Sequence, residues 1–459
     1  MKLNRRIGNL LRRSGDWIGG IGTSSGYNAG SGSGRWSGGS SLPAPASQTQ
    51  AASGLVSRRS AFAVANIPLA ASLLDTQINA VLPDMPSVRS GHPSEAIRLA
   101  LEQAFGQWSP PMTALVRGVE RSRFLTGDGI VILRTDPGAR LRLQLLPPDQ
   151  LDRTVNRTLP NGGQIIAGVE TDSRDLVVAF WVLPDAPDQA FAMIGPAQRI
   201  AADDVLHIYE KKFPGQRRGI SEFAPVLPRL HELEKLQDSL LARAGTAALF
   251  GGFVTDPSGM AFGDATPPPA SELGGLEPGA LRILPIGTDI KFPAMPDMAD
   301  APALLQHMQR DICCGCGVPF ELATGNLSTV NYSSAKVGME AYKRRCKALR
   351  ASILIPHLFL PIWRRWVMLE VLSGRLHAPD FDSNPEPYFA VSFLFSDWAA
   401  LDPLKDVQAD IAALQAGLRS RAEIIAARGR DIADVDAEIS ADSFVQPAPT
   451  APAKDDPNA

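Results

Sequence analysis

Two cysteines at CxxC spacing, Cys313 and Cys316, are the residues of this chain best placed to hold a metal ion. Cys346, His357 and His377 follow downstream and would complete a zinc site of thiolate and imidazole ligands. The pair lies within a helical repeat of apolar residues, however, and no second tight pair of ligands follows at zinc-finger spacing. We therefore interpret the cysteines as small, reduced thiols that pack one helix on another.

Two further patterns resemble parts of hydrolase sites. Residues 22–26, GTSSG, match the G-x-S-x-G turn of serine hydrolases, but low-complexity sequence surrounds them where a strand and a helix are needed. His231 and Glu232 begin like a zinc-protease helix, yet Lys235 stands where the second histidine belongs. The sequence therefore indicates no catalytic residue, no cofactor and no metal, and a metal-dependent or serine hydrolase stays only as an alternative.

The charge balance argues against a repressor that reads a DNA sequence. The chain carries 45 lysines and arginines against 48 aspartates and glutamates, for a formal charge of −3. Proteins that grip nucleic acid tightly release counterions from phosphates and show a basic excess, which this chain lacks. The four cysteines do not make the disulfide framework of a secreted domain, so reduced folding in the cytoplasm is favoured.

The most apolar window, residues 353–363, is about half as long as a bilayer span, which takes about 20 residues. It contains two prolines and ends in Arg364 and Arg365, so we interpret it as a buried helix. No apolar run long enough for a signal peptide follows the basic N-terminus. A peripheral membrane scaffold that uses this N-terminus and the window near Trp363 is the second alternative.

The first half of the chain predicts an α+β fold. Residues 1–58 begin with arginines and continue in glycine, serine, proline and alanine, which predicts a flexible arm. Helical periodicity runs from residue 60 to about 120. Alternating apolar residues, clearest in ARLRLQLL (139–146), then predict a mostly antiparallel sheet.

Long helices dominate the second half. Residues 225–253 have one apolar face and predict a helix, and another helix from about residue 298 stops at Gly317 and Pro319. A polar loop follows, and a longer helix with expected kinks at its prolines runs to Gly374. A polar loop between two long helices cannot be a core.

Two shorter helices are predicted near the C-terminus. Asp402 and Pro403 begin the first, whose apolar residues we expect to face inward: Leu404, Val407, Ile411 and Leu414. Ser420 and Glu423 form a capping box that starts the second.

The string CGVPFELATGNLSTVNYSSAK (316–336) resembles the signature of the lambda-type portal proteins of tailed bacteriophages. TGDGIVILR, LQLLPPDQLD and HIYEKKFPGQRRGISEFAPVL are similar to strings of the same family in the same order. The resemblance implies a portal fold of wing, stem, clip and crown with long channel-lining helices, assembling as a closed ring expected to hold twelve subunits. It implies a DNA channel at one capsid vertex rather than an enzyme.

The resemblance also divides the chain. It implies a flexible basic arm (1–58), an α+β wing (59–224), a stem helix (225–253), a clip (254–297), a second stem helix (298–320), a tunnel loop (321–333), a long kinked wing helix (334–375), C-terminal crown helices (376–440) and a disordered tail (441–459). The tunnel-loop residues expected to face DNA are Leu322, Thr324, Asn326, Leu327, Ser328, Thr329, Val330, Asn331 and Tyr332.

Partners follow from the same resemblance. They are further copies of the chain, double-stranded DNA bound without sequence specificity, the terminase large subunit, head-tail connector proteins and the major capsid protein, with no membrane. The expected location is the portal vertex of the virion, with assembly in the host cytoplasm. A near-neutral charge suits a conduit through which DNA slides without sticking.

Two polar groups have open roles. Gln216, Arg217 and Arg218 are candidates for a contact between subunits, or else form a solvated turn. A basic side of the long helix faces either DNA or a neighbouring subunit, which the sequence does not decide; its residues are Lys336, Lys343, Arg344, Arg345, Lys347 and Arg350.

Overall fold

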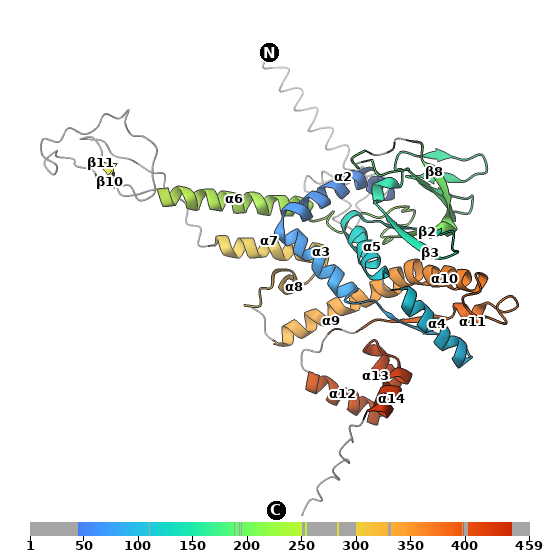
Figure 1. The fold of residues 1–459 in the computed structure, drawn as a ribbon. Coiled ribbons are helices and arrows are strands. Elements are labelled where there is room, and N and C mark those ends of the chain that lie inside the picture. Colours follow the sequence, from blue (N-terminus) through green and yellow to red (C-terminus); the bar gives the residue numbers. More distant parts are fainter. Residues whose placement is uncertain are drawn as a thin grey trace, which may run out of the picture.

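A computed structural model describes a mixed α and β protein (Figure 1). The described residues are 45–109, 111–187, 189–191, 193, 195–249, 253–254, 282–283, 300–328, 332–396, 398 and 403–442.

Four helices open the described chain, and the last of them packs against strands β2 (Gly129–Thr135) and β3 (Leu141–Leu146). They are α2 (Pro45–Asn66), α3 (Pro68–Val81), α4 (Glu95–Trp108) and α5 (Met112–Thr126). Pro68 lacks a backbone N–H and so starts α3 at its first position, where α2 and α3 meet at a bend of 101°. Gly127, at φ 99°, ends α5.

The helix α2 begins inside the segment for which the sequence predicts a flexible arm. Ser53, Ser57 and Ser60 are buried, and each donates its hydroxyl to a carbonyl three or four residues earlier in the helix. Serines therefore serve here as small packing residues rather than as linker. The boundary at residue 58 is corrected for residues 45–58, and residues 1–44 lie outside the described part.

Two antiparallel sheets form the β part. The order β3-β2-β9 joins Leu141–Leu146, Gly129–Thr135 and Val205–Ile208, and the order β4-β5-β6-β7-β8 joins Arg157–Thr158, Gln164–Ile166, Val169–Thr171, Val177–Val182 and Gln198–Ala201. Short 3₁₀ turns lie at Pro148–Gln150 (η4) and Ala202–Asp204 (η5). The predicted mostly antiparallel sheet is confirmed, although β8 is not among the predicted strands.

The strand β2 belongs to two cores because its side chains alternate. Val131 and Leu133 join the large core beneath the helices, whereas Ile130 and Ile132 join a second core with residues of the five-stranded sheet. This double burial fixes the sheets to the helical layer.

The long helices follow. They are α6 (Leu227–Leu249), α7 (Ala301–Cys316), α8 (Phe320–Thr324), α9 (Tyr332–Leu349), the π-helical segment η7 (Arg350–Phe359) and α10 (Leu360–Leu372). The prolines expected to kink the last helix leave it helical, with Pro356 inside the wider π turns. Strands β10 (Phe253–Val254) and β11 (Arg282–Ile283) pair in parallel at the far end of α6 (Figure 1).

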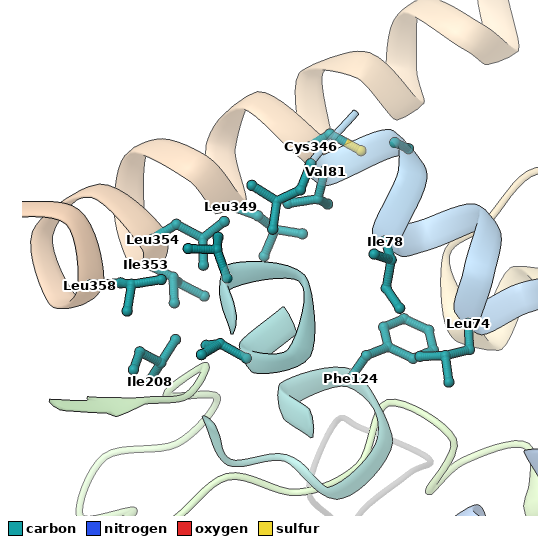
Figure 2. Close-up of a cluster of buried hydrophobic side chains, with 14 of the residues drawn as sticks. Leu74, Ile78, Val81, Phe124, Ile208, Cys346, Leu349, Ile353, Leu354 and Leu358 are labelled. Carbon is teal, nitrogen blue, oxygen red and sulfur yellow. The ribbon is translucent and has the colours of Figure 1, made fainter. Parts of the chain in front are cut away.

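Figure 2 shows how the long helix closes the large core. Leu349, Ile353 and Leu358 of α9 and η7 point toward α5 and Ile208 of β9, Ile78 of α3 lies beside Phe124 of α5, and all of them are buried. The apolar window of the sequence analysis is therefore a buried helix, as predicted. Trp363 and Trp366 continue the same face along α10.

The C-terminal part begins with α11 (Glu386–Phe389) and β12 (Val391–Leu394), which pairs antiparallel with β1 (Ser87–Ser90). Then come α12 (Pro403–Gln415), α13 (Arg421–Ala427) and α14 (Ile432–Ala441). Ser420 caps α13 by accepting from the Glu423 N–H, as predicted. The predicted inward face of α12 is wrong for this chain, because its apolar residues are exposed: Leu404, Val407, Ile411 and Leu414.

Candidate functional site

Two helices leave the body of the molecule side by side as an arm. In Figure 1, α6 and α7 extend together away from the sheets. At 1.5 Å per residue, the 23 residues of α6 span roughly 34 Å. Leu230 and Leu233 near its start are buried, whereas Leu241 farther along is 71% exposed. Only the root of the arm is therefore packed into the core.

The root of α7 packs closely against the start of α6. A Cβ added at Gly315 would lie 2.3 Å from Val226 Cγ1, so only glycine fits at this contact. Gly317, at φ 67°, ends α7, and the Val318 N–H donates to the Cys313 carbonyl as in a Schellman cap. The predicted helix end at Gly317 is confirmed.

The segment predicted as an irregular tunnel loop, residues 321–333, begins and ends in helix. Leu322 and Thr324 belong to α8, and Tyr332 is the first residue of α9. The reason is burial, since Phe320 and Ala323 of α8 pack into the core and the Ser72 hydroxyl donates to the Ala323 carbonyl at 2.5 Å. Among the described residues of this segment, the irregular part is therefore 325–328.

Local hydrogen bonds shape the described part of this loop. Ser328 donates its N–H and its hydroxyl to Asn326 Oδ1, at 3.1 and 2.6 Å, and the Asn326 N–H donates to Thr324 Oγ1 at 3.2 Å. Leu327 is 67% exposed. Thr329, Val330 and Asn331 lie outside the described residues. The exposed Leu327 side chain thus lies on a turn whose polar groups hydrogen-bond to one another.

The helix α9 is fastened to α3 by two buried polar contacts. The Tyr342 hydroxyl donates to Gln77 Oε1 at 3.0 Å, and burial raises the pKa of Tyr342. Arg350 donates from Nε to the Val81 carbonyl at 2.7 Å and from Nη2 to the Ala80 carbonyl at 3.1 Å. The guanidinium therefore satisfies carbonyls that the end of α3 leaves free.

The basic side of α9 is divided by the structure. Arg350 is buried, and the Arg345 guanidinium covers Gly317, where an added Cβ would lie 1.1 Å from Arg345 Nη1. Lys336, Arg344 and Lys347 are exposed. The exposed positive charge on this helix is therefore smaller than the sequence suggests.

A buried ionic cluster, here called the root cluster, fixes the segment that leads into α6. Asp128 is fully buried and accepts from Arg218 Nε at 2.9 Å and from the Gly219 N–H at 2.7 Å, with His207 Nε2 2.8 Å away. Burial alone would raise the pKa of Asp128, but the charge of Arg218 and the His207 contact hold it well below its usual range.

The root cluster continues through a second set of charges. Arg123 donates to both Glu120 oxygens at 2.7 and 2.8 Å and to Glu222 Oε1 at 3.2 Å, and Lys212 Nζ donates to Glu222 Oε2 at 2.8 Å. Burial would raise the pKa of Glu222, yet Arg123 and Lys212 lower it. The segment 212–222 is thereby ion-paired to α5 through Glu222 and Arg123, and to the turn between α5 and β2 through Arg218 and Asp128.

The predicted subunit contact at Gln216 and Arg218 is corrected by these bonds. Both side chains are buried, and Arg218 also donates to the carbonyls of Leu151 and Pro148. Gln216 Oε1 accepts from two backbone N–H groups within its own turn. Arg217 is ion-paired to Asp175 of the same chain.

Asp128, Arg123 and Glu222 are buried charged residues that the sequence analysis did not single out. Asp128 lies in TGDG and Glu222 in QRRGISEF, two strings that resemble the portal family, but neither string shows that its charge is buried.

The cysteine pair is buried without metal-site character. Burial raises the pKa of Cys313 to about 11 and that of Cys316 to about 12, so both are protonated thiols at neutral pH. Across the part of the chain that is described, no group of three or more histidine, cysteine or acidic side chains is arranged to hold a metal ion. The GTSSG motif lies outside the described residues.

Within the described ranges, no single helix is both long enough and apolar enough to cross a membrane. Helices α2 and α3 reach that length and apolarity only together, as a pair bent by 101°.

A comparison with protein families identifies the chain. The family model described as phage portal protein, lambda family, matches residues 33–350. The chain belongs to the lambda family of phage portal proteins. The match covers the root cluster, the arm, α8 and the start of the long helix. Portal proteins are structural rather than enzymatic, so the hydrolase alternative is not favoured.

Curated relatives carry the same description. The probable portal protein of Halomonas phage phiHAP-1 is 28% identical over 378 residues, which are 77% of this chain and 71% of the relative. The portal protein of Escherichia phage N15 is 24% identical over 260 residues, 51% of this chain and 49% of the relative. The chain is thus a portal protein of a phage or phage-like particle.

Solved structures that match this chain come from the necks of GTA (gene transfer agent) particles. One, titled as the neck of a native particle computed with C12 symmetry, has a TM-score of 0.43 and 15% identity, with 81% of this chain and 91% of that chain covered. Another, from an empty particle with C6 symmetry, has a TM-score of 0.45 and 14% identity, with 81% and 92% covered.

Proposed function

We propose that twelve copies of this chain form a closed ring through which double-stranded DNA enters and leaves a capsid. The observation that supports the proposal is the shape of the arm. Its two helices pack into the core at one end and have exposed side chains along much of their described length. Leu241 of α6 and Leu304 of α7 are exposed apolar residues on this arm. In a ring, the arms of neighbouring copies would cover one another and form the wall of a channel.

The loop after α8 is proposed to narrow that channel. It joins the root of α7, by way of α8, to the start of α9, so it lies where the arm meets the body (Figure 1). Its tip residue Leu327 is exposed, and asparagine and serine carry no charge that would hold phosphates. A loop without fixed charge permits DNA to slide, in keeping with the net charge of −3.

Other partners are proposed at the ends of the arm and around the body. The clip, residues 254–297, would dock the terminase large subunit during packaging and the head-tail connector proteins afterwards, and it lies outside the described residues except for 254 and 282–283. The α+β wing would contact the major capsid protein. Arg217 at the wing surface stays a proposed subunit contact, in exchange with its present partner Asp175.

Electron microscopy of the purified chain tests the ring. Class averages in negative stain are expected to show rings with a central hole and twelve-fold symmetry. Particles that stay monomeric or dimeric at every salt and protein concentration would contradict the proposal.

A loop variant tests the channel. Replacing Asn326, Leu327 and Ser328 with glycine removes the bonded turn and its apolar tip, so DNA packaging into capsids should fall while rings still form. Leu372→Ser, at an exposed residue of α10 far from the loop, is the matched control and should package normally. Normal packaging by the loop variant would remove the loop from the channel.

A further inference from the structure

The helices α2 and α6 border a hollow of about 550 Å³ at the root of the arm. Its apolar lining includes the buried side chains of Ala63 and Leu230, one from each helix, and Ile67 at the bend after α2. Phe62 forms part of the wall, and 65% of this residue is exposed. Pockets of about 300–1,000 Å³ hold drug-sized molecules. The hollow therefore has room for an apolar group as large as a tryptophan side chain with a neighbour.

Charged side chains stand at the rim of this hollow. Arg58 and Arg59 line it from α2, and both are exposed. Within the part of the chain that is described, neither guanidinium has an ion-pair or hydrogen-bond partner. On the other side, α6 contributes His231 and Glu234 to the lining, and among the same residues the Glu234 carboxylate also has no partner. An occupant therefore needs a carboxylate toward α2, a cation toward Glu234 and an apolar part between them.

The sequence of residues 12–21, RRSGDWIGGI, has this combination. Asp16 is the single acidic residue among residues 1–44, and Trp17 and Ile18 follow it directly. Two arginines precede it, at a distance of three and four residues. Tryptophan is among the side chains that most often anchor a contact in an apolar pocket. This segment therefore offers each group that the hollow and its rim require.

The segment is also connected to the chain at a suitable place. From Ile21 to Pro45, where α2 begins, the chain runs for about 24 residues, which span at most about 80 Å. Arg58 lies about 13 residues farther along α2, or roughly 20 Å from Pro45. The connection is long enough for docking, and a contact within one chain forms at a high effective concentration.

Other segments outside the described residues are placed less well. Residues 443–459 begin at the end of α14, which Figure 1 shows on the far side of α9 from α6. Residues 255–281 are held at both ends by the pairing of β10 with β11 at the far end of α6. The N-terminal segment, in contrast, leads directly into α2 beside the hollow.

We propose that residues 16–21, DWIGGI, dock into the hollow between α2 and α6 of the same chain. In the docked state Trp17 packs against Phe62 and the apolar lining, and the Asp16 carboxylate pairs with the two arginines of α2. The arginines before Asp16 then lie on the side of Glu234. Docking joins the N-terminal segment to the root of the arm. It does not depend on the proposed ring, so it takes place in the unassembled chain as well.

A disulfide trap in the full-length chain tests the docking. Gly19→Cys and His231→Cys are combined with Cys314→Ser, because Cys314 is exposed whereas the other three cysteines are buried. Oxidation with copper phenanthroline should join positions 19 and 231 at least about tenfold faster than in a control that has Glu232→Cys in place of His231→Cys. Glu232 is exposed beside His231 but does not line the hollow. Equal rates, measured by mass spectrometry of proteolytic peptides, would overturn the proposal.

Charge exchange tests the recognition of Asp16. Arg58→Glu with Arg59→Glu should slow the trap about tenfold, because the Asp16 carboxylate then meets two like charges. Adding Asp16→Arg should restore most of the rate, and failure to restore it would overturn the ion pair. Arg229→Glu, at an exposed residue of α6 outside the lining, should change the rate by less than about twofold. Circular dichroism checks that the variants fold alike.

Two further measurements identify the occupant. Trp17→Ser should slow the trap about tenfold, whereas Trp36→Ser, in the same N-terminal stretch, should not. Equal rates for these two variants would overturn the docking of Trp17. Isotope-labelled and unlabelled chains are then mixed before oxidation, and both halves of each linked peptide should come from one chain. Peptides with one labelled half would overturn docking within the chain and make a second copy the occupant.

Discussion

The root cluster and the C-terminal unit, which is α12–α14, place their charged and apolar side chains in opposite ways. At the root, Asp128, Arg123 and Glu222 are buried together and their charges are paired inside one chain. In α12–α14, ion pairs such as Arg421 with Asp436 lie near the surface, and the apolar side chains face outward. The first region pairs its charges within the single chain, whereas the second leaves apolar side chains exposed there.

This difference indicates which interactions stabilise each region. Ion pairs on a surface contribute little, whereas removal of one partner from a buried pair leaves an uncompensated charge. The root should therefore respond strongly to single substitutions at any protein concentration. The arm should respond mainly through assembly.

The sharpest test of the comparison is Asp128→Ala. This change leaves Arg218 buried without its carboxylate and should destabilise the unassembled chain by about 3–5 kcal/mol. Urea denaturation followed by tryptophan fluorescence measures the loss. Asp203→Asn, at an exposed acidic residue, is the control and should stay within about 0.5 kcal/mol of wild type. A small effect of Asp128→Ala would remove the distinction between the two regions.

The same carboxylate predicts a pH dependence. The folded-state pKa of Asp128 lies below the value of an unfolded aspartate, about 3.9, so its contribution is present above that pH and is lost as the pH falls below it. Between pH 5 and pH 3 the wild-type chain should lose more stability than Asp128→Asn does. Equal slopes for the two proteins would show that the lowered pKa has no part in stability.

Gly219→Ala tests the backbone contact beneath the root cluster. An added Cβ would lie 1.8 Å from the Gly127 carbonyl oxygen, and neither backbone can move without breaking the bonds of Asp128. We expect a loss of about 2–3 kcal/mol, as for other overpacked sites. Gly245→Ala, where nothing lies within 4 Å of the added atom, is the matched control and should not destabilise the chain.

Tyr342→Phe probes the contact between α9 and α3 at a smaller scale. It removes one hydroxyl and leaves Gln77 Oε1 buried without a donor, in a side chain whose Nε2 already has no partner. The expected loss is about 1–2 kcal/mol, measured by thermal unfolding. Gln77→Leu combined with Tyr342→Phe should recover part of it, because both polar groups are then gone.

Leu241→Ser should have the smallest effect on the single chain and a clear effect on rings. The side chain is 71% exposed on α6, so its loss should change unfolding by less than about 0.5 kcal/mol. If neighbouring arms cover it in the ring, assembly should still weaken. Unchanged assembly would place Leu241 on the channel side or on solvent, and would reduce the arm's share in the subunit contact.

The sequence predicted helices and strands where the spacing of apolar residues agrees with the glycines and prolines that end an element. It failed where the burial of a face depends on what packs against it. The apolar row of α6 and the stop at Gly317 predicted helices at 225–253 and from about 298, which the structure has at Leu227–Leu249 and Ala301–Cys316. Strand β8 has no buried residue, so no alternation announced it. The spacing of Leu404, Val407 and Ile411 showed that α12 has an apolar face, but spacing does not say whether the same chain covers it.

The root cluster escaped prediction for a related reason. Arg218 and Glu222 look like surface residues in a polar string, and only the fold brings Asp128 and Arg123, some 90 residues earlier, against them. The same string lies within residues 33–350, which the portal family model matches. The family match thus includes this region, while the pairing of its charges depends on the fold.

An arm clamped at one end behaves as a cantilever. Ion pairs and the Gly127–Gly219 contact hold residues 212–222 rigidly, whereas α6 beyond Leu233 has no core around it. A sideways load on the free part of α6 would therefore act as a torque on the root, where the ion pairs of Arg218 with Asp128 and of Glu222 with Arg123 would bear it.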